Sequence, residues 1–263
     1  MSDFLIIGGG INGLLLAREL AAAQADVVLL EKGECCREAS WAGGGIVSPL
    51  YPWRYPAEIT ALATWAQNFY PELAQTLLSD TGIDPEFSQS GLLMLDAEDE
   101  SQALQWATDN CRRLESVDHN FIYHHESKLA PGFGSGLWMP DVANIRNPQL
   151  GKALIADLQQ RENVSIVQRC QVESFERKGA KVVAVESRIE NQKRRFEAQQ
   201  VILCTGAWSG SLARKLLVTI NVEPVKGQML LYRIKGDLVN SIVLTRGRYA
   251  IPRRDGHLLV GST

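Results

Sequence analysis

The 263-residue sequence lacks any apolar run that approaches the ~20 residues of a membrane-spanning helix. It also lacks the basic amino-terminal segment of a secretory signal, because its first apolar run begins at Phe4. Positive charge is not in excess, since 27 basic and 30 acidic residues give a net charge of −3. We therefore expect a cytoplasmic protein without a membrane span and without a nucleic-acid partner.

Cysteine is scarce: the sequence contains five, an odd number, and their spacing is not recognisable. They are Cys35, Cys36, Cys111, Cys170 and Cys204. An odd count argues against a disulfide framework, and no spacing matches a metal-binding motif. We expect reduced, structural cysteines and no bound metal.

The stretch 4–20 has the pattern of a strand, a glycine turn and a helix. Gly8, Gly10 and Gly13 stand at the G-x-G-x-x-G spacing of dinucleotide-binding proteins. Gly8 permits the tight turn, Gly10 lets a pyrophosphate approach the backbone, and Gly13 lets the helix pack closely on the strand. The amino terminus of the helix then offers N–H groups to phosphate oxygens.

A second apolar run, 26–30, ends in Glu31, about 20 residues after the glycines. A carboxylate at the tip of the second strand suits a ribose hydroxyl, and its charge would repel a 2′-phosphate. A solvated strand end is the alternative interpretation of Glu31. By itself this strand-turn-helix-strand pattern does not distinguish an FAD-binding protein from an NAD-binding one.

The rest of the chain alternates between helical and strand patterns. Most residues at 39–45 are small. This indicates either that the backbone packs against a flat group or that the segment is a flexible loop. Helices are predicted at 57–68, 71–78, 97–115 and 147–160. Strands are predicted at 91–95, 121–123, 136–139 and 164–167, then as a meander at 172–176, 181–187 and 194–196. A buried strand at 200–204 precedes Thr205-Gly206-Ala207, and further strands are predicted at 221–234, 242–244, 249–252 and 258–261.

Several segments together resemble the D-amino-acid oxidase family of FAD-dependent oxidoreductases, and within it the glycine-oxidase branch of thiamine biosynthesis. They are GGGINGLLLAREL, EKG, REASWAGGGIVSPLYPWRYP, VANIRNPQL, CTGAWSG, VEPVKGQM and RYAIPRRDGHLLVGST. The resemblance implies an α/β protein with a Rossmann-type FAD-binding domain, whose parallel sheet carries an antiparallel meander. It also implies an α+β substrate domain with an antiparallel sheet. The expected FAD-binding domain comprises 1–85 and 143–218, and the expected substrate domain 86–142 and 219–263.

The resemblance also implies site residues. The expected FAD contacts are Gly8, Gly10, Ile11, Asn12, Gly13, Glu31, Lys32, Ser40, Gly44, Gly45, Ile46, Val172, Thr205 and Gly206. Tyr249 is the implied catalytic residue, lying over the substrate, and a packed strand tyrosine is the alternative interpretation. The neighbouring Arg246, Arg248, Arg253 and Arg254 are interpreted as surface charge.

The implied activity is oxidative deamination of glycine or another small amino acid. A hydride passes from the α carbon to flavin N5, the imine hydrolyses to glyoxylate and ammonia, and dioxygen yields hydrogen peroxide. The implied partners are the amino acid and dioxygen, and a homo-oligomer remains open. Two alternatives are a related dehydrogenase with another electron acceptor and a nucleotide-binding module without catalysis.

In the resembled family the chain continues past the strand at 258–261. The arginine that binds the substrate carboxylate and the C-terminal third of the fold are therefore expected beyond Thr263. From this we expect little oxidase activity from residues 1–263 alone.

Overall fold

The computed structural model describes residues 1–95 and 97–262, so the expectation concerning Thr263 lies outside the described residues. The chain forms two compact units, each assembled from three segments. The first unit comprises Met1–Ala42, Leu77–Ile83 and Pro148–Lys226, and the second comprises Gly43–Thr76, Asp84–Asn147 and Gly227–Thr263. The predicted α/β class is confirmed. Residues 43–76 cluster with the second unit, whereas the sequence prediction placed them in the FAD-binding domain together with the glycine motif.

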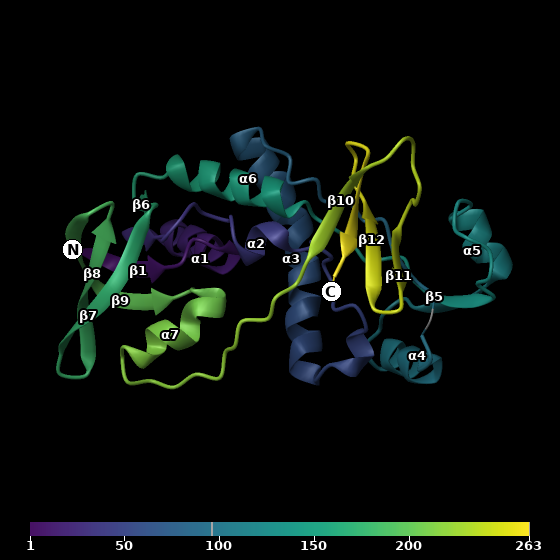
Figure 1. The fold of residues 1–263 in the computed structure, drawn as a ribbon, viewed down its shortest axis with the longest axis horizontal. Coiled ribbons are helices and arrows are strands. Elements are labelled where there is room, and N and C mark those ends of the chain that lie inside the picture. The colour runs from purple at the N-terminus through teal and green to yellow at the C-terminus, as the bar shows by residue number, and fades with distance from the viewer. Residues whose placement is uncertain (96, 263) are drawn as a thin grey trace. The chain divides into compact units, whose positions relative to one another are not determined.

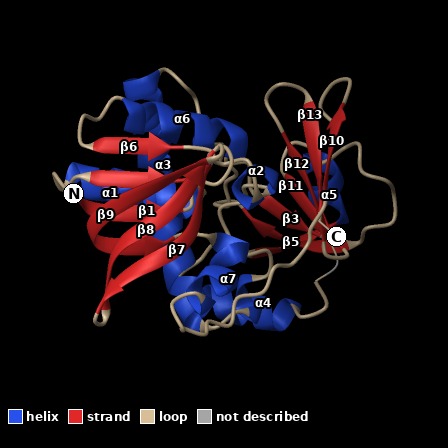
Figure 2. Ribbon diagram, turned by 60° about the vertical axis from the view of Figure 1, so that its left-hand side comes forward, coloured by secondary structure: helices blue, strands red, loops and turns tan. Residues whose placement is uncertain are grey.

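The first unit is built on a six-stranded sheet in the order β6-β2-β1-β9-β8-β7 (Figure 2). Its strands are β1 (Ser2–Ile7), β2 (Val27–Leu30), β6 (Val164–Val167), β7 (Cys170–Lys178), β8 (Lys181–Ile189) and β9 (Gln192–Leu203). The strands β6, β2, β1 and β9 run parallel, and β8 and β7 continue the sheet antiparallel. Leu5, Leu30 and Val185 lie in its core with no more than 1% of their surface exposed. Burial of such a side chain stabilises the fold by about 1.5–3 kcal/mol.

Strand β9 corrects one detail of the sequence prediction. The predicted strands at 194–196 and 200–204 are parts of one strand. Its first half pairs antiparallel with β8 through residues such as Phe196, and its second half pairs parallel with β1 from Ala198 onward. The sequence prediction left 197–199 outside both strands, but pairing with β1 from Ala198 onward keeps the backbone extended there.

The helices of the first unit include α1 (Ile11–Ala22), α2 (Ala39–Ala42), α6 (Asn147–Gln159) and α7 (Ser209–Arg214), with a 3₁₀ turn η2 at Gly206–Trp208. Figure 1 shows α1 in purple beside β1 and α7 in green. The predicted apolar face of α6 is confirmed, because Leu150, Leu154 and Leu158 are buried. Residues of α1, α2, η2 and α7 line the candidate site described below.

The second unit contains a seven-stranded sheet in the order β10-β13-β12-β11-β3-β5-β4. Its strands are β3 (Leu92–Met94), β4 (Glu115–Asp118), β5 (Ser135–Met139), β10 (Met229–Arg233), β11 (Ile242–Thr245), β12 (Arg248–Pro252) and β13 (His257–Gly261). All neighbours pair antiparallel except β11 and β3, which are parallel. The predicted turn at Asp255-Gly256 joins β12 to β13.

Several predicted elements of the second unit differ from the structure. The two helices predicted between 57 and 78 are one helix, α3 (Ala57–Thr81), which continues through Pro71 and passes into the first unit at Leu77. The predicted strand at 121–123 is helix α5 (His119–His125). Helix α4 (Glu100–Asp109) is shorter than predicted, the 3₁₀ turn η1 occupies Pro52–Arg54, and only Met229–Arg233 of the predicted strand 221–234 is a strand.

Two further findings concern the part of the chain that the structure describes. None of its helices combines the length and the apolar character needed to cross a bilayer. It also contains no cluster of three or more histidine, cysteine, aspartate or glutamate side chains that could hold a metal ion.

Candidate cofactor site

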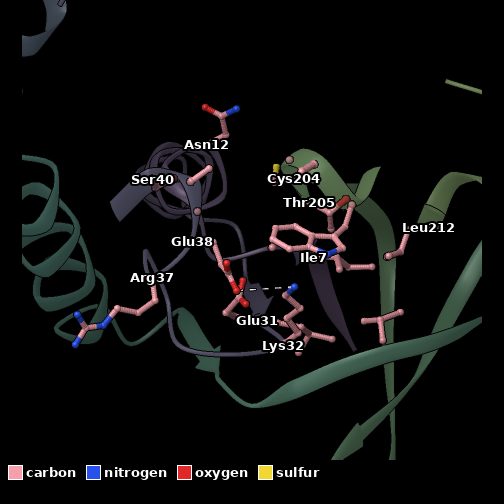
Figure 3. Close-up of a pocket in the computed structure, with 18 of the residues that line it drawn as sticks. Ile7, Asn12, Glu31, Lys32, Arg37, Glu38, Ser40, Cys204, Thr205 and Leu212 are labelled. Carbon is pink, nitrogen blue, oxygen red and sulfur yellow. Dashed lines mark ion pairs between the residues drawn. The ribbon is translucent and has the colours of Figure 1, made fainter. Parts of the chain in front are cut away.

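The first unit contains a cavity of about 290 Å³ at the carboxyl ends of its central parallel strands. Ile7 ends β1, Leu30 ends β2, and Cys204 follows β9, and all three line the cavity. Figure 3 labels Ile7 and Cys204 among the lining residues. Open α/β sheets bind ligands at this end of the strands, where the loops that follow neighbouring strands diverge. The strand order therefore places the cavity where a cofactor is expected.

The three fingerprint glycines have different surroundings. Gly8 has φ +111°, and a Cβ there would lie 2.3 Å from the backbone oxygen of Cys204. A Cβ on Gly13 would lie 1.9 Å from the oxygen of Gly8, which keeps helix α1 close to the turn. A Cβ on Gly10 would meet only Ser40 Oγ, at 3.2 Å, because Gly10 borders the cavity. Gly8 and Gly13 thus shape the backbone, and Gly10 keeps the cavity open.

Helix α1 presents its amino terminus at this cavity. The N–H of Ile11 donates to Ser40 Oγ at 2.9 Å. Among the described residues, the N–H groups of Asn12 and Gly13 have no hydrogen-bond partner, and the first turn of α1 carries no acidic residue. Unpaired N–H groups and the positive end of the helix dipole favour a phosphate at this position.

Glu31 lies directly after β2, and only 8% of its surface is exposed. Its Oε2 accepts from the N–H of Gly9 at 2.7 Å, and its Oε1 accepts from the N–H of Gly33 at 2.8 Å. Each carboxylate oxygen has a further lone pair. Glu31 is thus held in place by the backbone and can still accept a hydrogen bond from a ribose hydroxyl.

Two thiols lie close to this carboxylate. Burial, and secondarily the charge of Glu31, raises the pKa of Cys35 to about 12 and that of Cys36 to about 11. Both thiols therefore stay protonated at neutral pH. Cys36 lines the cavity as a small neutral group rather than as a nucleophile.

Lys32, Glu38 and Trp208 meet at one side of the cavity, as Figure 3 shows for Lys32 and Glu38. Lys32 Nζ lies 3.2 Å from the ring centroid of Trp208 and 3.9 Å from Glu38 Oε1. The cation and the indole form a wall that is partly aromatic and partly charged. Such a wall suits a ligand with a flat ring and phosphate groups.

The cavity gathers most of the residues that the sequence singled out. They are Gly8, Gly10, Ile11, Asn12, Glu31, Lys32, Ser40, Val172, Thr205 and Gly206. Sequence reasoning missed other lining residues, including Glu38, Trp208, Leu212 and Lys215. Trp208 stands in the CTGAWSG segment, which was a signal for it, but Leu212 and Lys215 reach the cavity only through the placement of α7.

Of the remaining predicted residues, Gly13 belongs to the first unit, and Gly44, Gly45, Ile46 and Tyr249 belong to the second. A Cβ on Gly44 would lie 2.9 Å from Tyr249 Cε2, so the tyrosine ring packs directly on Gly44. Gly45 has φ +74°, and Ile46 forms a bridge with Asn144. The Tyr249 hydroxyl donates to Met229 Sδ at 3.4 Å. The contacts of Gly44, Gly45 and Ile46 with a flavin, and of Tyr249 with a substrate, stay predictions.

The structure contradicts the interpretation of Arg253 as surface charge. Its guanidinium donates to the backbone oxygens of Gly44 and Ile145 and to Asn144 Oδ1. Burial, and then the nearby charge of Arg146, lowers the pKa of Arg253 to about 10. The strand pattern around it gave no signal for this, because its partners lie more than a hundred residues earlier in the chain.

The residues around the cavity fit an adenine dinucleotide. The open face of Gly10 and the free N–H groups of α1 fit a pyrophosphate, and Glu31 fits a ribose with free hydroxyls. A 2′-phosphate would meet the negative charge of Glu31. The cavity thus suits a dinucleotide whose adenosine ribose carries free hydroxyls.

Comparisons with known proteins agree with this geometry. The family model described as "DAO: FAD dependent oxidoreductase" matches residues 3–263. The glycine oxidases of Pseudomonas putida and Pseudomonas aeruginosa are each 49% identical over 259 residues, which cover 98% of this chain and 70% of the relative. The crystal structure of glycine oxidase from Bacillus cereus, 22% identical, matches with a TM-score of 0.89 and covers 100% of this chain and 71% of that one.

Proposed function

This chain belongs to the DAO family of FAD-dependent oxidoreductases, and we propose that it oxidises glycine or another small amino acid with dioxygen as electron acceptor. The chain is an FAD-dependent amino-acid oxidase. The observation that carries the substrate proposal is the 49% identity to two glycine oxidases along nearly the whole chain. That level of identity supports a shared substrate more strongly than a shared fold does.

FAD is the cofactor, and the first unit contains the residues that would hold it. The amino terminus of α1 and the open face of Gly10 would hold the pyrophosphate, and Glu31 the ribose. Val172 and Thr205 border the same cavity. When bound, FAD supplies a flavin ring that accepts the hydride of the amino acid and passes the electrons to dioxygen.

The chain's own contribution to the reaction is to bind and orient the amino acid. Tyr249 is the residue proposed to lie over the substrate, and its hydroxyl is held by Met229. Gly44 has no side chain, so the ring of Tyr249 can lie against its backbone. In balance, glycine, water and dioxygen give glyoxylate, ammonia and hydrogen peroxide, because the imine formed by loss of hydride is hydrolysed.

A role in forming the thiazole of thiamine is part of the proposal and rests on the family resemblance. A strain that lacks this gene is expected to need thiazole or thiamine for growth if the protein supplies that route. Growth without either compound, at the rate of the parent strain, would contradict this role while leaving the oxidase activity in place.

The test of the substrate proposal is a survey of peroxide release under air by the complete, FAD-loaded protein. Glycine and sarcosine are expected to release peroxide, and a bulky D-amino acid to release much less. A reaction that proceeds only with an artificial acceptor, without peroxide, would make the protein a dehydrogenase. A bulky D-amino acid that reacts well while glycine does not would overturn the substrate.

A further inference from the structure

We propose that Arg253 is a positioning residue for amino-acid oxidation, because its guanidinium holds the Gly44 backbone against which the ring of Tyr249 lies. The inference rests on the proposed function, in which Tyr249 meets the substrate. All three residues belong to the second unit. Arg253 acts through the other two and need not touch the substrate itself.

The guanidinium joins two segments of the second unit. Arg253 Nη2 donates to the Gly44 oxygen at 2.7 Å, and Nη1 donates to Asn144 Oδ1 at 2.9 Å and to the Ile145 oxygen at 3.3 Å. Ile145 in turn donates its N–H to the Gly45 oxygen at 2.8 Å. A planar fork with several donors can fix two backbone segments at once, which a single ammonium group does less well.

The ring of Tyr249 lies against the backbone that Arg253 fixes. A Cβ on Gly44 would lie 2.9 Å from Tyr249 Cε2 and 3.1 Å from Ile251 Cδ1. Tyr249, Ile251 and Arg253 are two residues apart along β12 and its end, so their side chains leave the same face of the strand. All three reach Gly44, and a shift of its peptide would move the tyrosine ring.

Stability alone is a poor reason for a cation at this position. Among the described residues no carboxylate lies within ion-pair distance of Arg253, and its partners are neutral oxygens. The nearby Arg146 is paired with Glu86 and Asp255. An apolar side chain fills such a space at less desolvation cost. What the guanidinium adds is the fixed orientation of the Gly44 carbonyl.

The neighbouring Arg254 provides a matched control. Its side chain is 54% exposed, and it pairs with Asp84 and donates to the Phe87 oxygen. Arg253→Gln and Arg254→Gln each remove one charge, but only the first removes the bond to Gly44. Displacing a group that orients a substrate by about 1 Å can cost up to roughly a hundredfold in rate.

The experiment compares these variants as FAD-loaded proteins with glycine as substrate. For Arg253→Gln saturated with FAD, kcat/KM is expected to fall roughly tenfold or more. Arg253→Lys is expected to recover part of the loss, and Arg254→Gln to behave as the parent. An unchanged kcat/KM in Arg253→Gln would overturn the inference.

A double-mutant cycle separates positioning from general weakening of the fold. Tyr249→Phe is expected to lower kcat/KM in the parent and to have a smaller effect in Arg253→Gln, because the ring is then already displaced. Equal effects in both backgrounds would overturn the inference. If Arg253→Gln does not fold, Gly44→Ala is the second variant, and an unchanged kcat/KM there would also overturn it.

The parent protein distinguishes this inference from the proposed function. If the FAD-loaded parent releases no peroxide from glycine, the proposed function is wrong and the inference falls with it. If the parent is active and only the Arg253→Gln comparison fails, the function stands and the inference alone is wrong.

Discussion

At the scale of single residues, Glu31 connects the fold to the cofactor site. Its carboxylate accepts N–H groups from Gly9 and Gly33, which lie in the two loops bordering the cavity. Losing it would leave two N–H groups without acceptors, at about 1–3 kcal/mol for each that stays buried. The acid therefore fixes the site's geometry before any ribose is bound.

Gly10 tests the placement of the pyrophosphate. Valine at this position would put methyl groups into the cavity, where we expect the phosphates. We predict that Gly10→Val binds FAD roughly 10- to 100-fold more weakly, measured by quenching of flavin fluorescence.

The matched control for this variant is Gly134→Val, since a Cβ on Gly134 would meet nothing within 4 Å. Gly134 belongs to the second unit and does not line the cavity of the first. The control should bind FAD as the parent does. Parent-like affinity in Gly10→Val would place the pyrophosphate elsewhere.

The cysteines allow a prediction from their pKa values. Cys35 and Cys36 have pKa values of about 12 and about 11, and burial also raises the pKa of Cys170 and Cys204. Only Cys111 is exposed. We predict that iodoacetamide at pH 8 labels Cys111 in the folded, FAD-loaded protein and the other four thiols only after unfolding. Rapid labelling of Cys36 in the folded protein, seen by peptide mass spectrometry, would contradict this.

The same thiols contribute to the pH dependence of stability. An unfolded thiol ionises near its ordinary pKa of 9.0, whereas Cys35 and Cys36 ionise at about 12 and about 11 when folded. A raised pKa in the folded state favours folding below pH 9, and this contribution is lost as the pH rises from 9 toward 12.

The fingerprint residues could be predicted from the sequence because their roles depend on local backbone geometry. Gly8, Gly10 and Glu31 lie within one strand-turn-helix-strand unit, and the resemblance extended the set to Ser40 and Thr205. Arg253 could not be predicted in this way. Its role depends on a loop more than two hundred residues away, which no local pattern encodes.

At the scale of elements, helix α5 shows where a short apolar pattern misleads. The run Phe121-Ile122-Tyr123 is compatible with a strand or a helix, and its length cannot decide between them. Asp118 provided a signal, since its carboxylate accepts from the N–H of Phe121 and caps α5. The strand predicted at 221–234 was wrong over 221–228 for another reason. Among the described residues, pairing with a neighbouring strand begins only at Met229.

Pro71 in helix α3 gives a prediction at the same scale. It lies in the helix interior, is exposed, and cannot donate an N–H to the turn before it. We predict that Pro71→Ala stabilises the protein by about 1–3 kcal/mol and raises its melting temperature by a few degrees. Glu72→Ala, at the next exposed position, serves as control. A lower melting temperature in Pro71→Ala would show that α3 needs the proline at this position.

At the scale of the whole molecule, each compact unit draws on three separate stretches of the chain. Hydrophobic periodicity identifies elements but does not assign distant stretches to one unit, so the expected domains came from the resemblance. The stretch 43–76 shows the limit of that approach. It follows the glycine motif directly in sequence, yet its contacts group it with the second unit.

The most direct test of the account is the visible spectrum of the FAD-loaded protein when glycine is added without oxygen. The account predicts that glycine bleaches the absorption band of oxidised flavin, and that air then restores the band and releases hydrogen peroxide. An equal concentration of a bulky D-amino acid should leave the band nearly unchanged. If glycine leaves the band intact while dithionite bleaches it, the flavin is bound and reducible but glycine is not its substrate, and the central claim is contradicted.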